Sequence, residues 1–349
     1  MTTTLRLSVL DLIPVRRGQT TAQALTATIA LARQADVLGF ERYWVAEHHN
    51  MQAVASTNPP VLIGIIAANT QRIRVGSGGV MLPNHAPLVI AEQFGLLEAA
   101  FPGRIDLGLG RAPGSDPVIS ALLRSSGAVS EVDAFPRNIG DILALLHPDG
   151  ASLALTSGQN YDLRATPAAS SVPTVWLLGS SEYSAHLAAA HGLPYVFANH
   201  FSGESTVEAL NIYRKEFTPS ETEKAPRTFL TLNLSVADTA EEARALALPQ
   251  MQQMAKLRSG QPLGPLATVE EAQLAEVTPM QQEMIERMSA SWIVDEPRAA
   301  AARIRALAVE FGVDEVMVQP VGSAYAGAPR DASPARMRAL ELLAAELLG

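Results

Sequence analysis

The chain has 349 residues, of which 48% are hydrophobic and 17% charged, and its formal net charge is −9 at pH 7. This composition is typical of a folded protein, and the acidic balance argues against nucleic acid as a partner because it leaves no basic surface for a phosphate backbone. The absence of cysteine excludes disulfides, thiolate metal sites and a cysteine nucleophile, and it fits a reducing compartment. The first residues lack a signal-peptide pattern and no apolar run approaches the roughly 18 residues of a membrane span, so we expect a cytoplasmic protein that does not contact a membrane.

Short β-rich runs alternate with helical stretches along the chain. The expected strands are residues 5–10, 42–46, 73–78, 105–109, 174–178, 195–198, 228–236 and 315–319. Between them, residues 21–38 repeat apolar side chains at helical spacing, and a helix over 181–191 ends at Gly192. Strand-helix alternation implies parallel strands, and eight repeats favour a closed barrel over an open doubly wound sheet. We therefore predict an α/β fold of the TIM (β/α)8 barrel type.

Two excursions interrupt this rhythm in what we expect to be one barrel domain over residues 1–349. Residues 112–172 exceed one helix and predict a helical pair with a surface excursion. Residues 249–288 combine five methionines with several glycines and prolines, which predicts a long insertion at the C-terminal rim of the barrel. The sequence leaves open whether this insertion is a mobile lid or an ordered helical excursion. Capping-box spacings at Thr239 with Glu242 and at Ser205 with Glu208 predict two further helix starts.

The second strand ends in Glu47, His48 and His49. Alternate side chains of a strand face opposite ways, so His48 should face away from the other two. An imidazole at the C-terminal mouth of a barrel suits proton transfer because its ordinary pKa is about 6.5, and His48 is therefore the candidate catalytic residue. A metal site is the alternative, but neither His-x-His on a strand nor His-x3-His on a helix occurs here, and we predict none.

Three further segments suggest a site for a flat, anionic ligand. Gly78 and Gly79 end the third strand, where glycine allows a turn, a bulge or close approach of a ligand to the backbone. Arg111 ends the fourth strand, and a serine turn over residues 179–184 joins the fifth strand to a helix whose amino terminus favours anions. Neighbouring barrel strands would place Arg111 and this turn face to face. Together they predict a phosphate clamp, although each alone could be a structural ion pair or a plain helix cap.

Taken together, these motifs resemble the bacterial luciferase-like, flavin-dependent monooxygenases. The resemblance rests on residues 39–40, 44–49, 75–83, 102–111, 176–181 and 192–194, and more weakly on 314–318. It implies a barrel that binds reduced FMN, with oxygen as co-substrate, and oxidises a small organic substrate. It also implies a separate NAD(P)H-dependent flavin reductase as partner, and a homodimer formed through the helices after the second and third strands, where Glu92 lies.

Carried over residue by residue, the resemblance assigns roles to seven positions. His48 matches the catalytic histidine, and the pair Gly78 and Gly79 matches a non-proline cis peptide that lies against the flavin ring. The cofactor-binding positions at the phosphate are Arg111, Ser180, Ser181 and Ser184. Gly110 stands where luciferases carry a reactive cysteine, so light emission is not expected.

Other functions and further pocket residues stay open from sequence. The same fold serves deazaflavin (F420)-dependent oxidoreductases, and a non-catalytic flavin-binding protein or a metal-dependent barrel hydrolase are further alternatives. Four more side chains are candidates to line the pocket: Trp44, Met81, His200 and Tyr325. None of them identifies the substrate beyond an organic molecule with an apolar part.

Overall fold

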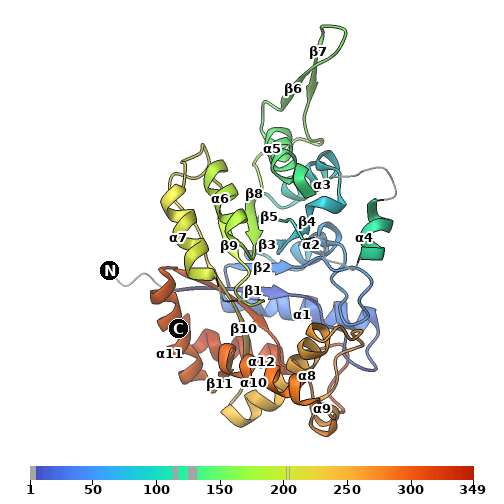
Figure 1. Cartoon of the computed structure of the whole chain (residues 1–349), viewed down its shortest axis with the longest axis vertical. Helices are drawn as coiled ribbons and strands as arrows, with labels where there is room; N and C mark the ends of the chain where they lie inside the picture. Colours follow the sequence, from blue (N-terminus) through green and yellow to red (C-terminus); the bar gives the residue numbers. More distant parts are fainter. Residues whose placement is uncertain (1–4, 113–116, 125–131, 202, 204) are drawn as a thin grey trace.

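Eight parallel strands form the centre of the molecule in the computed structural model, which describes residues 5–112, 117–124, 132–201, 203 and 205–349 (Figure 1). They are β1 (Arg6–Asp11), β2 (Arg42–Val45), β3 (Arg74–Ser77), β5 (Ile105–Gly110), β8 (Thr174–Gly179), β9 (Tyr195–Phe197), β10 (Leu230–Val236) and β12 (Glu315–Pro320). Hydrogen-bonded neighbours run in the order β10-β12-β1-β2-β3-β5-β8-β9. A parallel bridge between Tyr195 and Thr228 then brings β9 beside the start of β10. The predicted α/β barrel is confirmed, and the strands differ from the expected ranges only at their ends.

Helices surround this curled sheet (Figure 1). They are α1 (Thr21–Leu38), α2 (Pro59–Ala68), α3 (Pro87–Ala100), α5 (Phe135–Leu146), α6 (Glu182–His191), α7 (Thr206–Glu216), α8 (Ala240–Arg258), α11 (Pro297–Phe311) and α12 (Pro334–Leu347). Local chemistry explains the ends of α1, because Thr20 and Gln23 form a capping box and Gly39 takes the left-handed conformation with φ 85. The Thr239 side chain caps α8 by accepting from the Glu242 amide, as predicted. The helix start predicted at Ser205 is confirmed, since Ser205 is the N-cap residue of α7, although its side chain makes no capping bond.

In its described residues, the first excursion contains two α-helices, a 3-10 helix and a hairpin. After α4 (Pro117–Arg124) and the short 3-10 helix η2 (Val132–Ala134) comes α5, followed by the antiparallel strands β6 (Ala151–Ala154) and β7 (Asn160–Leu163). The hairpin projects from the barrel above α5 in Figure 1.

The second excursion is helical and packed, and it begins later than the sequence indicates. Helix α8 continues through Pro249, and α9 (Val269–Leu274) and α10 (Pro279–Ser291) follow. Apolar side chains of α8 and α10 form a buried cluster whose members include Met251, Ile285 and Met288. The glycines and prolines of residues 260–265 lie between α8 and α9, and Pro279 stands in the first turn of α10, where proline is tolerated.

Three short elements lie outside the predicted pattern. Strand β4 (Val80–Met81) pairs with β5, the 3-10 helix η1 (Leu82–Asn84) follows it directly, and β11 (Ile293–Asp295) pairs with β10. Among the described residues, no helix is both long and apolar enough to span a membrane.

The barrel interior holds a buried ion network beneath an aromatic cluster. The guanidinium of Arg42 contacts Glu315 at 2.7 Å (Nε to Oε1) and Asp106 at 2.9 Å (Nη1 to Oδ2). Trp44 donates from Nε1 to Asp106 Oδ2 at 3.0 Å, and its ring packs against Trp176 with centroids 5.5 Å apart. Buried charges are tolerated when they are paired and fully hydrogen-bonded, as they are here. This network fixes the position of Trp44, whose ring lies toward the site described next.

Candidate functional site

A cavity of about 390 Å³ opens among the carboxyl ends of the strands. All of the predicted site residues line it: His48, Gly78, Gly79, Arg111, Ser180, Ser181 and Ser184. Its volume falls in the range of about 300–1,000 Å³ that small-molecule sites commonly have. The structure therefore brings together side chains that come from four separate segments of the chain.

His48 lies just beyond β2, and its ring is buried against the cavity. Its backbone amide donates to the Ser56 carbonyl at 2.9 Å, while its Nδ1 is buried and has no hydrogen-bond partner among the described residues. Burial lowers the pKa of His48 below 6.5, and the nearby Glu47 carboxylate only partly opposes this effect. The imidazole is therefore neutral at pH 7, and its ring is the titratable group that this segment brings to the cavity.

Glu47 faces away from the cavity, as strand alternation predicts, and holds the adjacent loop. Its Oε1 accepts from Nε2 of both His49 and His85 at 2.8 Å, and its Oε2 accepts the Met81 amide at 2.9 Å. Burial alone would raise the pKa of Glu47, but these hydrogen bonds outweigh it and lower the value to about 2. The carboxylate thus fixes Met81, a cavity residue, from behind. No group of metal-ligating side chains suited to an ion occurs in the described parts of the chain.

Gly78 and Gly79 are joined by a cis peptide bond, as the family resemblance implies. A Cβ on Gly78 would lie 2.9 Å from Leu10 Cδ1 and 3.1 Å from Trp44 Cε3. A Cβ on Gly79 would lie 2.5 Å from Leu178 Cδ1. Leu10, Trp44 and Leu178 all line the cavity, so glycine is required for these walls to approach the backbone.

Arg111 and the serine turn form the cationic, hydroxyl-rich end of the cavity. The Arg111 guanidinium lies 4.3 Å from the centroid of the Tyr183 ring, which orients it beside the turn. Ser181 is the N-cap residue of α6, yet its side chain makes no capping bond and remains available to a ligand. Gly179 leaves space for Ser184, whose Oγ a Cβ at that position would overlap. This donor set suits a phosphate.

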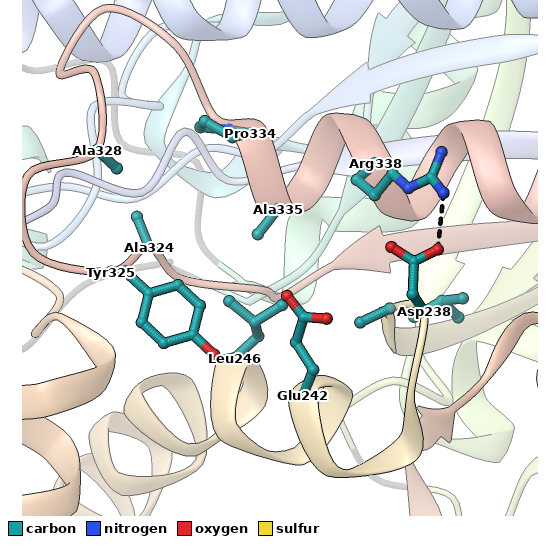
Figure 2. A pocket seen from close by; sticks show the side chains of 11 residues that line it. Asp238, Glu242, Leu246, Ala324, Tyr325, Ala328, Pro334, Ala335 and Arg338 are labelled. Carbon is teal, nitrogen blue, oxygen red and sulfur yellow. Dashed lines mark hydrogen bonds and ion pairs between the residues drawn. The ribbon is translucent and has the colours of Figure 1, made fainter.

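Of the four further candidates, Trp44, Met81 and His200 line this cavity, and the prediction for Tyr325 is wrong. Tyr325 lies on a separate pocket of about 210 Å³ between α8 and α12, shown in Figure 2. That pocket follows β10 and β12, the seventh and eighth barrel strands, where barrels commonly bind phosphate. Here the carboxylates of Asp238 and Glu242 line it, and Asp238 is paired with Arg338 at 2.7 Å. Two carboxylates disfavour an anion, so the Arg111 end is the better phosphate site.

Comparison with known proteins agrees with this geometry. Residues 5–315 match the family model described as luciferase-like monooxygenase. A luciferase-like monooxygenase of Escherichia coli strain K12 is 39% identical over 315 residues, which are 90% of this chain and 91% of the relative. The protein YvbT of Bacillus subtilis strain 168 is 40% identical over 338 residues, 97% of this chain and 95% of the relative. The solved structure of apo-MsnO8 is 34% identical, with a TM-score of 0.84 and 98% of each chain covered.

More distant structures share the fold alone. One is the oxygenating constituent of 3,6-diketocamphane monooxygenase from Pseudomonas putida in complex with FMN, with 17% identity, a TM-score of 0.69 and 99% and 98% of the two chains covered. Another is the coenzyme F420-dependent tetrahydromethanopterin reductase of Methanopyrus kandleri, with 15% identity, a TM-score of 0.68 and 99% of each chain covered. From the cavity, the family model and the close relatives together, we conclude that this chain belongs to the luciferase-like monooxygenase family.

Proposed function

We propose that this chain is a monooxygenase that uses reduced FMN and oxygen to oxidise a small organic substrate. The observation that carries the proposal is a single cavity with a neutral imidazole, a pair of glycines and a cationic, hydroxyl-lined end. Reduced FMN, when bound, supplies the electrons and the carbon to which oxygen adds.

The residues present fit this cofactor. Arg111, Ser180, Ser181 and Ser184 would hold its phosphate, because a guanidinium, hydroxyls and a helix amino terminus all donate to anions. Gly78 and Gly79 present backbone without side chains to a flat ring.

His48, whose imidazole lines the cavity, would hold or move a proton there. Because burial lowers its pKa, the ring can accept a proton at pH 7 without carrying one beforehand. The apolar wall of the cavity, which includes Trp44, Leu178 and Met317, would exclude water from the reacting groups and contact an apolar part of the substrate.

The proposal includes a source of the cofactor and an assembly. A separate NAD(P)H-dependent flavin reductase would supply reduced FMN in the cytoplasm. A homodimer would form through α2 and α3, which carry several exposed apolar side chains, among them Val61 and Leu96.

The test is anaerobic titration with reduced FMN, followed by oxygen and measurement of substrate-dependent oxygen uptake. His48→Ala should bind reduced FMN normally and lose about 10²- to 10⁴-fold in oxygenation rate, because general acid-base assistance is typically of this size. Arg111→Ala should weaken binding of reduced FMN first. Matched controls are His147→Ala and Arg298→Ala, which change exposed side chains that do not line the cavity.

Three outcomes would contradict the proposal. Full oxygenation by His48→Ala would remove His48 from the chemistry. Response to reduced deazaflavin with none to reduced FMN would make the chain a deazaflavin-dependent oxidoreductase. Binding of FMN without substrate-dependent oxygen uptake, across a broad panel of organic compounds, would indicate a flavin carrier.

A further inference from the structure

A second histidine, His200, lines the same cavity and is held by residues of β10. Its Nδ1 lies 2.9 Å from Thr231 Oγ1, and its backbone carbonyl accepts from Asn233 Nδ2 at 2.6 Å. Because the Nδ1 edge of the ring is turned to Thr231, the Nε2 edge is the one left for the cavity.

The hydrogen bonds around Thr231 determine which nitrogen of His200 carries the proton. The Thr231 hydroxyl has one proton, and it lies 3.1 Å from the Phe197 carbonyl, which can only accept. The His200 backbone amide donates to the same hydroxyl oxygen at 3.3 Å. All three bonds form together only if Thr231 donates to Phe197 and His200 donates from Nδ1. The Nε2 nitrogen then carries a lone pair and no proton.

His200 also stays uncharged. Burial, and to a smaller extent the nearby His48, lower the pKa of His200 to about 4. At pH 7 the ring is therefore neutral, and Nε2 remains an acceptor. The cavity wall that His200 shares includes apolar side chains, among them Val196, Phe201 and Met317. An acceptor on the wall of a partly apolar cavity favours a ligand that supplies a donor, because a ligand without one would displace water from Nε2 and leave it unpaired.

We propose that His200 Nε2 accepts a hydrogen bond from an O–H or N–H group of a ligand bound in this cavity. The inference rests on the proposed function, which allows two sources for the donor: a ring N–H of the cofactor, or a hydroxyl or amine of an otherwise apolar substrate. In either case the fixed acceptor selects against ligands that are methylated at that position.

The test compares ligand pairs that differ only in the donor. Binding of FMN and N3-methyl-FMN is measured by flavin fluorescence, and binding of 4-methylphenol and 4-methylanisole by calorimetry. The wild-type protein should prefer the donor-bearing member of one pair by about five- to tenfold, the usual effect of one neutral hydrogen bond. His200→Phe, which keeps an aromatic ring without the acceptor, should abolish that preference.

Two further variants separate recognition from structural damage. His200→Gln restores a side-chain acceptor and should recover part of the preference. His191→Phe, at the far end of α6 from the serine turn, should leave it unchanged. Thermal unfolding of each variant checks that the fold is kept.

The two pairs identify the source of the donor. If His200→Phe loses the preference for FMN over N3-methyl-FMN, the donor belongs to the cofactor. If it loses the preference for 4-methylphenol over 4-methylanisole, the donor belongs to the substrate. Equal binding of both members of each pair by the wild type, or an unchanged preference in His200→Phe, would overturn the inference. Failure of the proposed function would show instead as absent oxygen uptake with reduced FMN, an independent readout that leaves the ligand-pair comparison intact.

Discussion

Glu47 and His48 are adjacent in the chain but have separate positions in the fold. His48 lines the cavity, and Glu47 contacts two histidines and the Met81 amide of β4 behind it. Strand alternation predicts this division from sequence. It does not predict His85 as a partner, since that residue is 38 positions away and approaches only because the segment after β3 turns back toward β2.

Sequence motifs mark some residues of the site, but they do not show contacts between residues that are far apart in the chain. The glycine pair, Arg111 and the serine turn are each marked by motifs. The acceptor state of His200 has no sequence signal, because it depends on a threonine from another strand and on the Phe197 carbonyl. The prediction that Tyr325 lines the cavity is wrong. Its position after the last strand places it near the carboxyl ends of the strands, but the sequence does not show which pocket there its loop contacts.

Glu47→Gln should destabilise the protein at pH 7 by roughly 1–3 kcal/mol, because it removes a buried charge that accepts three partly buried hydrogen bonds. The pKa of Glu47 falls from 4.5 to about 2 on folding, so its stabilising effect is full above pH 4.5 and is lost as the pH falls toward 2. The difference in unfolding free energy between wild type and variant should therefore narrow below pH 4.5.

Urea unfolding at pH 7, 4.5 and 3.5 measures this difference. Glu283→Gln, which changes an exposed side chain on α10, is the control and should unfold like the wild type. A difference in unfolding free energy between wild type and Glu47→Gln that grows as the pH falls would contradict the assignment of an ionised Glu47.

Among the elements, β5 shows how the sheet limits side-chain size beside the cavity. A Cβ on Gly108 would overlap the carbonyl oxygen of Ser77 on β3, whereas a Cβ on Gly110 would lie 3.6 Å from Met81 Sδ, an ordinary contact. The position of Gly108 therefore excludes a side chain, whereas that of Gly110 has room for a methyl group, although only Leu109 separates the two glycines. Only the distance to the neighbouring strand distinguishes them.

We expect Gly108→Ala to lower the free energy of unfolding by about 1–3 kcal/mol or more, the cost typical of overpacking, and Gly110→Ala to change it little. Thermal unfolding of the two variants side by side measures the difference. Equal stability of the two would mean that β3 and β5 are not packed as described.

Secondary structure was predictable where the pattern is long and local. The strand and helix alternation follows from hydrophobic periodicity, and α1 from its cap and its terminal glycine. The very short strands β4 and β11 carry too few residues for a period to be visible. The sequence predicts that the second excursion begins at Pro249, but α8 continues through this proline because its packing against α10 outweighs the local effect of proline.

For the whole molecule, the exposed apolar side chains on α2 and α3 bear on assembly. Val61 is 59% exposed and Leu96 56% exposed, and the two helices are neighbours in the fold. An interface there would bury these side chains, in agreement with the homodimer that the family resemblance implies.

The double variant Val61→Asp and Leu96→Asp should convert a dimer to a monomer at micromolar concentration, because unpaired carboxylates are costly in an apolar interface. Sedimentation velocity measures the change. Val309→Asp is the control, since Val309 is 83% exposed and belongs to α11, a helix that lies away from α2 and α3 in Figure 1. A monomeric wild type, or a dimer that survives the double substitution, would refute this interface.

Trp44 forms a fixed wall of the cavity. Its ring lines the cavity while its indole nitrogen is anchored to the Arg42–Asp106 ion network beneath, and Trp176 and Phe229 pack around it. Trp44 and the groups packed around it thus close this side of the cavity, so a ligand that reaches Trp44 enters from elsewhere. We therefore expect ordered binding, in which a molecule that contacts Trp44 binds before, and dissociates after, any molecule that lies nearer the opening.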